Sequence, residues 1–265
     1  MRFVSADARP LALVTGASTG IGYELARCCA ERGFDLVIAA DERAIAAAAR
    51  SLTAAGGVVE PVEADLATVE GVDRLYAALG GHGVDALIAN AGRGLGGAFL
   101  DQEFAHARRV VETNITGTLY LLHRIGNDMR ARGHGRILIT GSIAGLMPST
   151  YQAVYGGTKA FLDSFAYALR RELQEHGISV TCLMPGATKT AFFDRADMQD
   201  TKLAHAGKDD AAAVARQGFA AMMRGDGGIV TGWHNKLKAA LASIVPAKAL
   251  ADAHARRARP GSARE

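Results

Sequence analysis

Short apolar segments alternate with amphipathic helical segments along almost the whole chain of 265 residues. This alternation is typical of βαβ units, whose strands lie parallel in one sheet and are buried on both faces. Only 6% of the residues are aromatic, so we expect an aliphatic core. The pattern predicts a single doubly wound α/β domain, with helices on both faces of a parallel sheet of about seven strands. We expect the strands at about 11–15, 35–40, 58–62, 84–89, 136–141, 178–184 and 228–231.

The helical segments fill most of the gaps between these strands. An irregular segment at about 187–207 carries Phe192, Phe193 and Met198, which suits a lid over a pocket. We expect one domain over residues 1–253, this lid included. Helices are predicted at about 21–32, 42–55, 68–79, 101–131, 151–176 and 208–223.

The last segment, 254–265, holds four arginines and one glutamate, a net charge of +3. The whole chain also carries +3, which leaves residues 1–253 neutral. A basic end without interleaved aromatic residues is typical of a solvated tail rather than of a nucleic-acid interface. We therefore expect a disordered tail and no nucleic-acid partner.

Cysteine and histidine usage argues against a metal centre. Cys28, Cys29 and Cys182 lack metal-ligand spacing, and an odd number gives no disulfide framework, which indicates a reducing cytoplasm. The eight histidines form no zinc motif. No apolar run approaches the length of a membrane span, and the N-terminus lacks a signal-peptide core.

A glycine-rich turn follows the first predicted strand, with the sequence Thr-Gly-Ala-Ser-Thr-Gly-Ile-Gly over residues 15–22. A turn between a strand and a helix aims free backbone N–H groups at a pyrophosphate, and side chains there would hold the phosphates away. Such a turn also occurs where it serves packing alone. The predicted cofactor contacts are Gly16, Ser18, Thr19, Gly20, Ile21 and Gly22.

Several further motifs occur in a fixed order. Tyr155 and Lys159 stand four apart on one predicted helix face, and Ser142 lies upstream at the end of the fifth strand. Asn114, Asn90-Ala91-Gly92 and Pro185-Gly186 complete the set. Together with the glycine-rich turn, this order resembles the short-chain dehydrogenase/reductase family over roughly residues 10–232, and it implies a Rossmann-type fold that uses a nicotinamide dinucleotide.

The residue types suit hydride transfer to a carbonyl, which needs a positioned acid. A free tyrosine, with a pKa of about 10, is too weak an acid near neutrality, and a nearby ammonium lowers that pKa. We expect Tyr155 to act as the acid, Lys159 to assist it, and Ser142 to hydrogen-bond the reacting oxygen. The resemblance implies that Lys159 also holds the nicotinamide ribose and that Asn114 holds a water in a proton relay.

The resemblance also implies cofactor contacts from Asp65, Asn90, Ala91, Gly92, Pro185, Gly186, Thr188 and Thr190. Taken one at a time, several of the motif residues could have a purely structural role. Ser142 could satisfy the backbone at a strand end, and Asn114 could be a structural asparagine inside a helix. Residues 90–92 could form a plain turn, and Thr188 or Thr190 could cap a helix. One departure from relatives is Gly156-Gly157, between the tyrosine and the lysine, where small residues such as Ser and Ala are usual.

Asp41 ends the second strand, where a carboxylate accepts hydrogen bonds from the adenosine ribose and repels a 2′-phosphate. This favours NAD, although Arg43 keeps NADP open. A solvated acidic helix start is the structural alternative.

The substrate side is predicted to be apolar, and its residues include no cation. This favours a hydrophobic ketone or secondary alcohol, although the phenylalanine pair could also anchor the loop to the core. The candidate contacts are Leu95, Leu146, Met147, Tyr151, Phe192 and Phe193.

Two other functions stay open: an NADP-linked reductase of 3-oxoacyl thioesters, and a dinucleotide-binding sensor without turnover. The long helices at 101–131 and 151–176 resemble the pair through which family members associate, so we expect a homodimer or homotetramer.

Overall fold

Seven parallel strands form one sheet in the computed structural model of this protein, which describes residues 9–264. This confirms the predicted sheet; the start of the expected domain, residues 1–8, and Glu265 lie outside the described residues. The strand order is β3-β2-β1-β4-β5-β6-β7. The strands are β1 (Leu11–Thr15), β2 (Asp35–Ala40), β3 (Val59–Glu63), β4 (Ala86–Ala89), β5 (Gly135–Thr140), β6 (Ile178–Met184) and β7 (Gly228–Val230).

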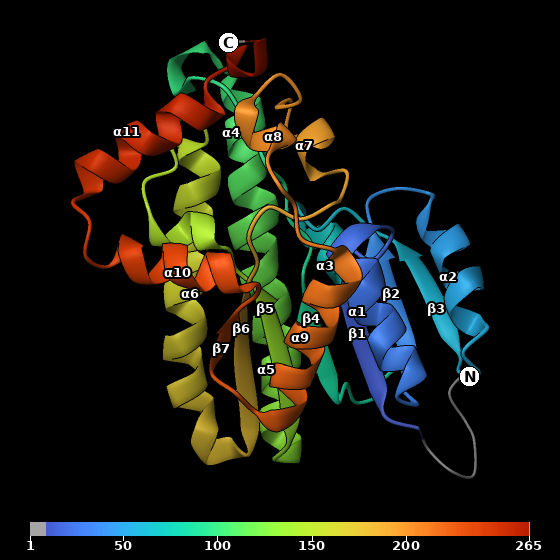
Figure 1. The fold of residues 1–265 in the computed structure, drawn as a ribbon. Helices are drawn as coiled ribbons and strands as arrows, with labels where there is room; N and C mark the ends of the chain where they lie inside the picture. Colours follow the sequence, from blue (N-terminus) through green and yellow to red (C-terminus); the bar gives the residue numbers. More distant parts are fainter. Residues whose placement is uncertain (1–8, 265) are drawn as a thin grey trace.

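Two apolar clusters fill the space on opposite faces of the sheet, because side chains alternate along each strand. Leu13 belongs to one cluster and its neighbour Val14 to the other. Figure 1 shows the helices as layers on both sides of the strands. One layer contains α1 (Gly20–Glu31), α2 (Ile45–Thr53) and α9 (Ala211–Arg224). The other contains α3 (Val69–Ala78), α5 (Thr118–Arg132) and α6 (Ala153–Leu173).

The chain reverses its winding direction at β1. Strands β2 and β3 extend the sheet on one side of β1, whereas β4 pairs with its other side. In such sheets the ligand crevice lies outside the carboxyl ends of the strands at this switch point. The glycine-rich turn after β1 and the Asn90 segment after β4 therefore meet at one edge.

The helix predicted at 101–131 is interrupted. It consists of a short helical turn η1 (Phe99–Asp101), helix α4 (Phe104–Val111), a π-helical segment η2 (Glu112–Gly117) and then α5. At Gly117 the helix lies against the backbone of Leu66. A Cβ on Gly117 would lie only 1.7 Å from the Leu66 carbonyl oxygen. The wider π turn lies at this contact and contains Asn114.

The disordered tail predicted for residues 254–265 is wrong for its described part. After α10 (Trp233–Ala242), helix α11 (Ala247–Ala258) runs through the basic segment to a final turn η5 (Ser262–Arg264). Ser262 is buried and its Oγ accepts a hydrogen bond from the Lys202 amide at 3.0 Å. The Gly261 and Ala263 amides donate to Asp200. These local partners hold a segment whose charge alone indicated a solvated end.

The segment 187–207 contains two short helices, α7 (Phe192–Arg195) and α8 (Lys202–His205), packed around buried Phe193 and Met198. Two further turns complete the chain, η3 (Ile143–Leu146) after β5 and η4 (Gln174–His176) after α6. Among residues 9–264, no helix is both long and apolar enough to cross a membrane.

Candidate active site

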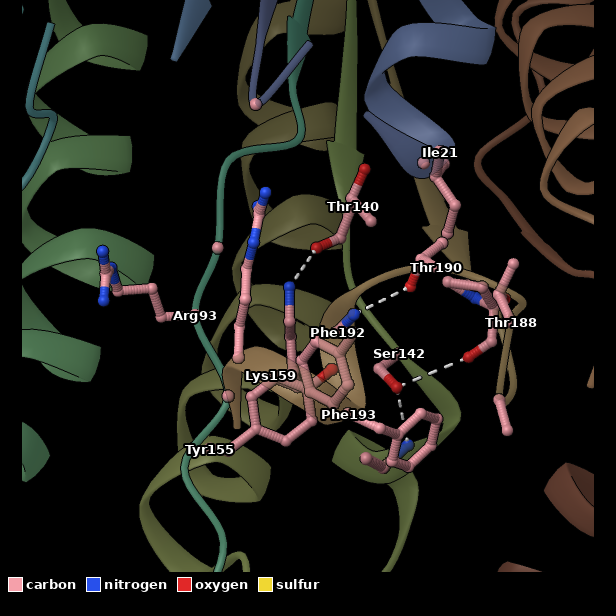
Figure 2. Close-up of a pocket in the computed structure, with 18 of the residues that line it drawn as sticks. Ile21, Arg93, Thr140, Ser142, Tyr155, Lys159, Thr188, Thr190, Phe192 and Phe193 are labelled. Carbon is pink, nitrogen blue, oxygen red and sulfur yellow. Dashed lines mark hydrogen bonds between the residues drawn. The ribbon is translucent and has the colours of Figure 1, made fainter. Parts of the chain in front are cut away.

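A cavity of about 630 Å³ opens at the carboxyl edge of the sheet, with the glycine-rich turn on one side and α10 and α11 on the other. Every residue predicted to contact the cofactor lines it: Gly16, Ser18, Thr19, Gly20, Ile21, Gly22, Asp41, Asp65, Asn90, Ala91, Gly92, Tyr155, Lys159, Pro185, Gly186, Thr188 and Thr190. Figure 2 shows part of this lining.

The glycine-rich turn leaves room for a ligand at the start of α1. Gly16 and Gly20 adopt positive φ values of 65° and 62°, and a Cβ on Gly22 would lie 2.1 Å from the Gly16 carbonyl oxygen. Thr19 precedes the helix, and its side chain does not cap the N-terminal amides. These free N–H groups and the helix dipole suit an anion such as a pyrophosphate.

Asn90 joins three strands beneath this turn. Its Nδ2 donates to the carbonyl oxygens of Thr15 and Gly16 at 3.1 and 3.3 Å. Its Oδ1 accepts from Thr140 Oγ1 at 3.1 Å. The ends of β1, β4 and β5 are thereby fixed relative to one another.

Acidic side chains at the end of β2 are paired with arginines that the sequence did not single out. Arg93 donates to Asp41 at 2.8 Å, and Arg195 of α7 donates to Glu42 at 2.8 Å. Burial opposes ionisation of Asp41, but the hydrogen bond and charge of Arg93 outweigh it and lower the pKa of that carboxyl. Arg43, considered from the sequence, does not line the cavity.

Asp65 follows β3 and is likewise paired. Its Oδ2 accepts from Arg109 Nη2 at 2.7 Å, and its Oδ1 accepts from the Ala67 amide at 3.1 Å. The adenosine end of the predicted site therefore contains neutralised acid–arginine pairs.

Ser142, Tyr155 and Lys159 converge at the other end of the cavity (Figure 2). Ser142 Oγ accepts from the Ala144 amide at 3.1 Å and donates to the Pro185 carbonyl at 3.4 Å. Lys159 Nζ donates to the Thr140 carbonyl at 2.7 Å and lies 5.8 Å from the Tyr155 ring centroid. The first turns of α6 thus face the end of β5.

Asn114 does not line the cavity. It is fully buried, its Oδ1 accepts from the Arg93 amide at 2.7 Å, and its Nδ2 donates to the Arg93 carbonyl and to Thr158 Oγ1. A Cβ on Gly92 would lie 3.3 Å from Asn114 Oδ1 and 3.5 Å from Lys159 Nζ. Asn114 therefore holds the backbone of residues 92–93, which lies between Asn114 and Lys159.

The expected lowering of the tyrosine pKa is wrong for this arrangement. Burial raises the pKa of Tyr155 to about 12, although its hydrogen bond with Ser142 opposes the rise. Burial also lowers the pKa of Lys159 to about 8, while the charge of Asp163 opposes that shift. The ammonium donates to the Thr140 carbonyl. Desolvation is the largest cause of the pKa shift in both Tyr155 and Lys159.

Asp163 is a buried carboxyl that the sequence analysis missed. Its Oδ1 accepts from the Ser142 amide at 3.2 Å and from Cys182 Sγ at 3.5 Å, while Oδ2 has no partner among the described residues. Burial raises its pKa to about 6. The available signal was spacing: Tyr155, Lys159 and Asp163 recur every four residues on one helix face.

The predicted substrate residues divide into two groups. Met147, Phe192 and Phe193 line the cavity, and the Phe192 ring lies 5.0 Å from that of Tyr155. The others, Leu95, Leu146 and Tyr151, are not part of the lining. Leu146 packs on the main core and Tyr151 on the Phe193 cluster, because apolar loop residues are satisfied by the nearest core.

The C-terminal helices form a further wall of the cavity. Helices α10 and α11 contribute polar and cationic side chains to the cavity, although the predicted substrate contacts contain no cation. These residues are His234, Asn235, Lys238, His254 and Arg257.

The two glycines between Tyr155 and Lys159 differ in their surroundings. A Cβ on Gly156 would lie 2.5 Å from that of Ser149, so this helix passes close to the preceding loop. Gly157 is exposed, and a Cβ there would meet nothing within 4 Å. Only Gly156 is required by packing.

Comparison with known proteins assigns this architecture. The profile of the family described as short chain dehydrogenase matches residues 10–201. An uncharacterized oxidoreductase from Myxococcus xanthus is 34% identical over 94% of this chain and 97% of its own length. The chain belongs to the short-chain dehydrogenase family, whose members are oxidoreductases that use NAD or NADP.

Two other similarities cover different shares of the chain. A 17-beta-hydroxysteroid dehydrogenase type 1 from Mus musculus is 33% identical over 69% of this chain but only 55% of its own length. A solved short-chain dehydrogenase from Sphingobium yanoikuyae, in complex with NADPH, has a TM-score of 0.79 at 28% identity. That similarity covers 89% of this chain and 96% of that one.

We predict that Lys159 makes stability depend on alkaline pH. Its pKa falls from the ordinary value of 10.5 to about 8, so between these values the unfolded chain binds more protons and rising pH favours folding. Lys159→Met removes this effect. In urea unfolding at about pH 7.5 and 9.5, the wild type should gain roughly 2 kcal/mol relative to the variant. Exposed Lys248→Met serves as the control; an equal pH response of Lys159→Met and wild type would contradict the prediction.

Proposed function

We propose that this protein transfers a hydride between a nicotinamide dinucleotide and an apolar ketone or secondary alcohol, with Tyr155 as general acid and base. The observation that carries the proposal is the convergence of Ser142, Tyr155 and Lys159 in one cavity with a phosphate-binding turn. Phe192 and Phe193 support the apolar substrate, as does the similarity to a hydroxysteroid dehydrogenase.

Bound NAD(P)H would supply the hydride, and the glycine-rich turn with Asn90 would hold its pyrophosphate end. In reduction, the Tyr155 hydroxyl gives its proton to the oxygen of the substrate carbonyl. Ser142 donates a hydrogen bond to the same oxygen as negative charge develops. The Lys159 ammonium stabilises the negative charge of the resulting phenolate.

The sensor alternative lacks a supporting observation, because a binding module has no need for a buried lysine beside a tyrosine. Burying the Lys159 ammonium costs stability, and such a costly buried charge is typical of functional sites. The three cysteines are buried and unpaired, which supports a reducing compartment such as the cytoplasm.

Tyr155→Phe keeps the ring and removes the exchangeable proton. We expect turnover of an identified substrate to fall by about 10²-fold or more, with NADH binding retained. Steady-state kinetics and fluorescence titration of NADH measure the two effects. Tyr167→Phe, on an exposed face of the same helix, is the matched control. A near wild-type kcat in Tyr155→Phe would contradict the role of Tyr155 as general acid and base.

We propose NAD as the preferred cofactor, because Asp41 is ionised and lines the cavity. Its partner Arg93 and the NADPH-bound relative keep NADP as the alternative. The wild type should bind NADH more tightly than NADPH, and Asp41→Ala should narrow the difference by removing repulsion of the 2′-phosphate. Titration with both nucleotides measures this, with exposed Glu63→Ala as the control. Tighter NADPH binding by the wild type would contradict it.

We also propose that the protein is a homodimer or homotetramer. Val111 of α4 and Phe161 of α6 are exposed apolar side chains on the helices expected to associate. Sedimentation velocity at micromolar concentration should give a dimer or tetramer, and Phe161→Lys should shift it toward monomer. A strict monomer in the wild type would refute the proposal.

A further inference from the structure

Helices α10 and α11 border the substrate side of the cavity. Helix α10 packs against η3, the turn that directly follows Ser142. Helix α11 is tied to the loop before Tyr155: Thr150 Oγ1 donates to the Ala251 carbonyl at 2.9 Å, and His254 Nδ1 donates to the Thr150 carbonyl at 2.8 Å. This wall is therefore held in place next to the reacting groups.

Two cations reach the cavity from this wall, Lys238 of α10 and Arg257 of α11. Within residues 9–264, neither side chain forms a hydrogen bond or an ion pair. Burial and the positive charge of Arg257 lower the pKa of Lys238, so the two charges repel each other. Asp209 also lines the cavity and its charge opposes the fall in the pKa of Lys238, but its carboxylate accepts from Asn235 Nδ2 at 2.7 Å and forms no ion pair with Lys238.

The other end of the cavity differs in charge. Arg93 and Arg195, which also line it, are paired with Asp41 and Glu42. Burial and the charge of Arg257 lower the pKa of His254, which disfavours a positive charge on this imidazole. The cavity thus has acid–arginine pairs at the proposed cofactor end, whereas at the other end two cations face a single carboxylate, Asp209.

We propose that Lys238 and Arg257 bind an anionic group, a carboxylate or a phosphate, on the substrate whose carbonyl or alcohol reacts at Tyr155. The inference rests on the proposed function and narrows its substrate class to an apolar chain with a negative terminus. Phe192, Phe193 and Met147 line the cavity and suit the apolar part. A lone ammonium and a guanidinium left without partners gain most from an anion that pairs with both.

The first experiment measures binding and does not depend on turnover. Calorimetry with octanoate, octyl phosphate and the neutral isostere octanamide, in the presence of NAD, should give at least about tenfold tighter binding of one anion than of the amide. The better anion distinguishes the carboxylate from the phosphate source. Lys238→Met and Arg257→Met should each remove most of this preference, and added salt should weaken it.

Matched controls come from the same helices. Lys236→Met on α10 and Arg256→Met on α11 remove exposed cations that do not line the cavity, and they should leave the anion preference intact. NADH affinity is titrated in all four variants. A loss of NADH affinity in Lys238→Met and Arg257→Met, without loss of anion preference, would assign these cations to the cofactor and overturn the inference.

The second experiment compares turnover of 2-decanone with that of 9-oxodecanoate, a methyl ketone of equal length with a terminal carboxylate. The kcat/KM ratio of acid to ketone should exceed one and fall about tenfold in the double variant. Equal binding of octanoate, octyl phosphate and octanamide would refute the inference even if both ketones react. Absence of hydride transfer to any ketone would refute the proposed function. The anion preference would still be decided by the calorimetry alone.

Discussion

The hydrogen bonds of Asn90 fix the edge of the sheet on which the cavity is built. One side chain bonds the turn after β1, sits at the end of β4 and accepts from Thr140 at the end of β5. The Thr140 carbonyl then accepts from Lys159, which stands one helical turn after Tyr155. The glycine-rich turn and the proposed catalytic groups are thus connected through three strand ends. Because parallel strands bring all these ends to one edge, residues far apart in sequence share one site.

The sequence predicted the strands and most helices, and it singled out residues that line one cavity, because these follow from local signals: apolar periodicity, glycines at required turns and residues at strand ends. It did not predict the interruption around Asn114, which lies where Gly117 approaches the Leu66 backbone closely. Nor did it predict the fate of residues 254–264, since the buried Ser262 and the amide contacts to Asp200 depend on tertiary packing. Charge patterning measures solvation tendency and says nothing about such partners.

Electrostatics at Tyr155 shows a similar limit. Spacing places Lys159 on the face of Tyr155, but it does not reveal that both are desolvated or that the buried Asp163 adds a third titratable group. Burial raises the pKa of Tyr155 and lowers the pKa of Lys159, so it favours the uncharged form of both groups. An unpaired Oδ2 on Asp163 shows that this region is polar and incompletely compensated. The arrangement is costly for folding, which is the usual condition of groups held ready for proton transfer.

The two ends of the cavity are built from structural elements with different constraints. The cofactor end is built from the sheet edge and from glycines that no other residue can replace without collision. The proposed substrate end is built from segments 187–207 and 233–264, which lie outside the sheet. Charges at the cofactor end are paired, whereas Lys238 and Arg257 are left without partners. Lys238 and Arg257 face one cavity from two helices and have no ion-pair partner among residues 9–264, so an anionic group on a substrate is the ligand that their charges favour.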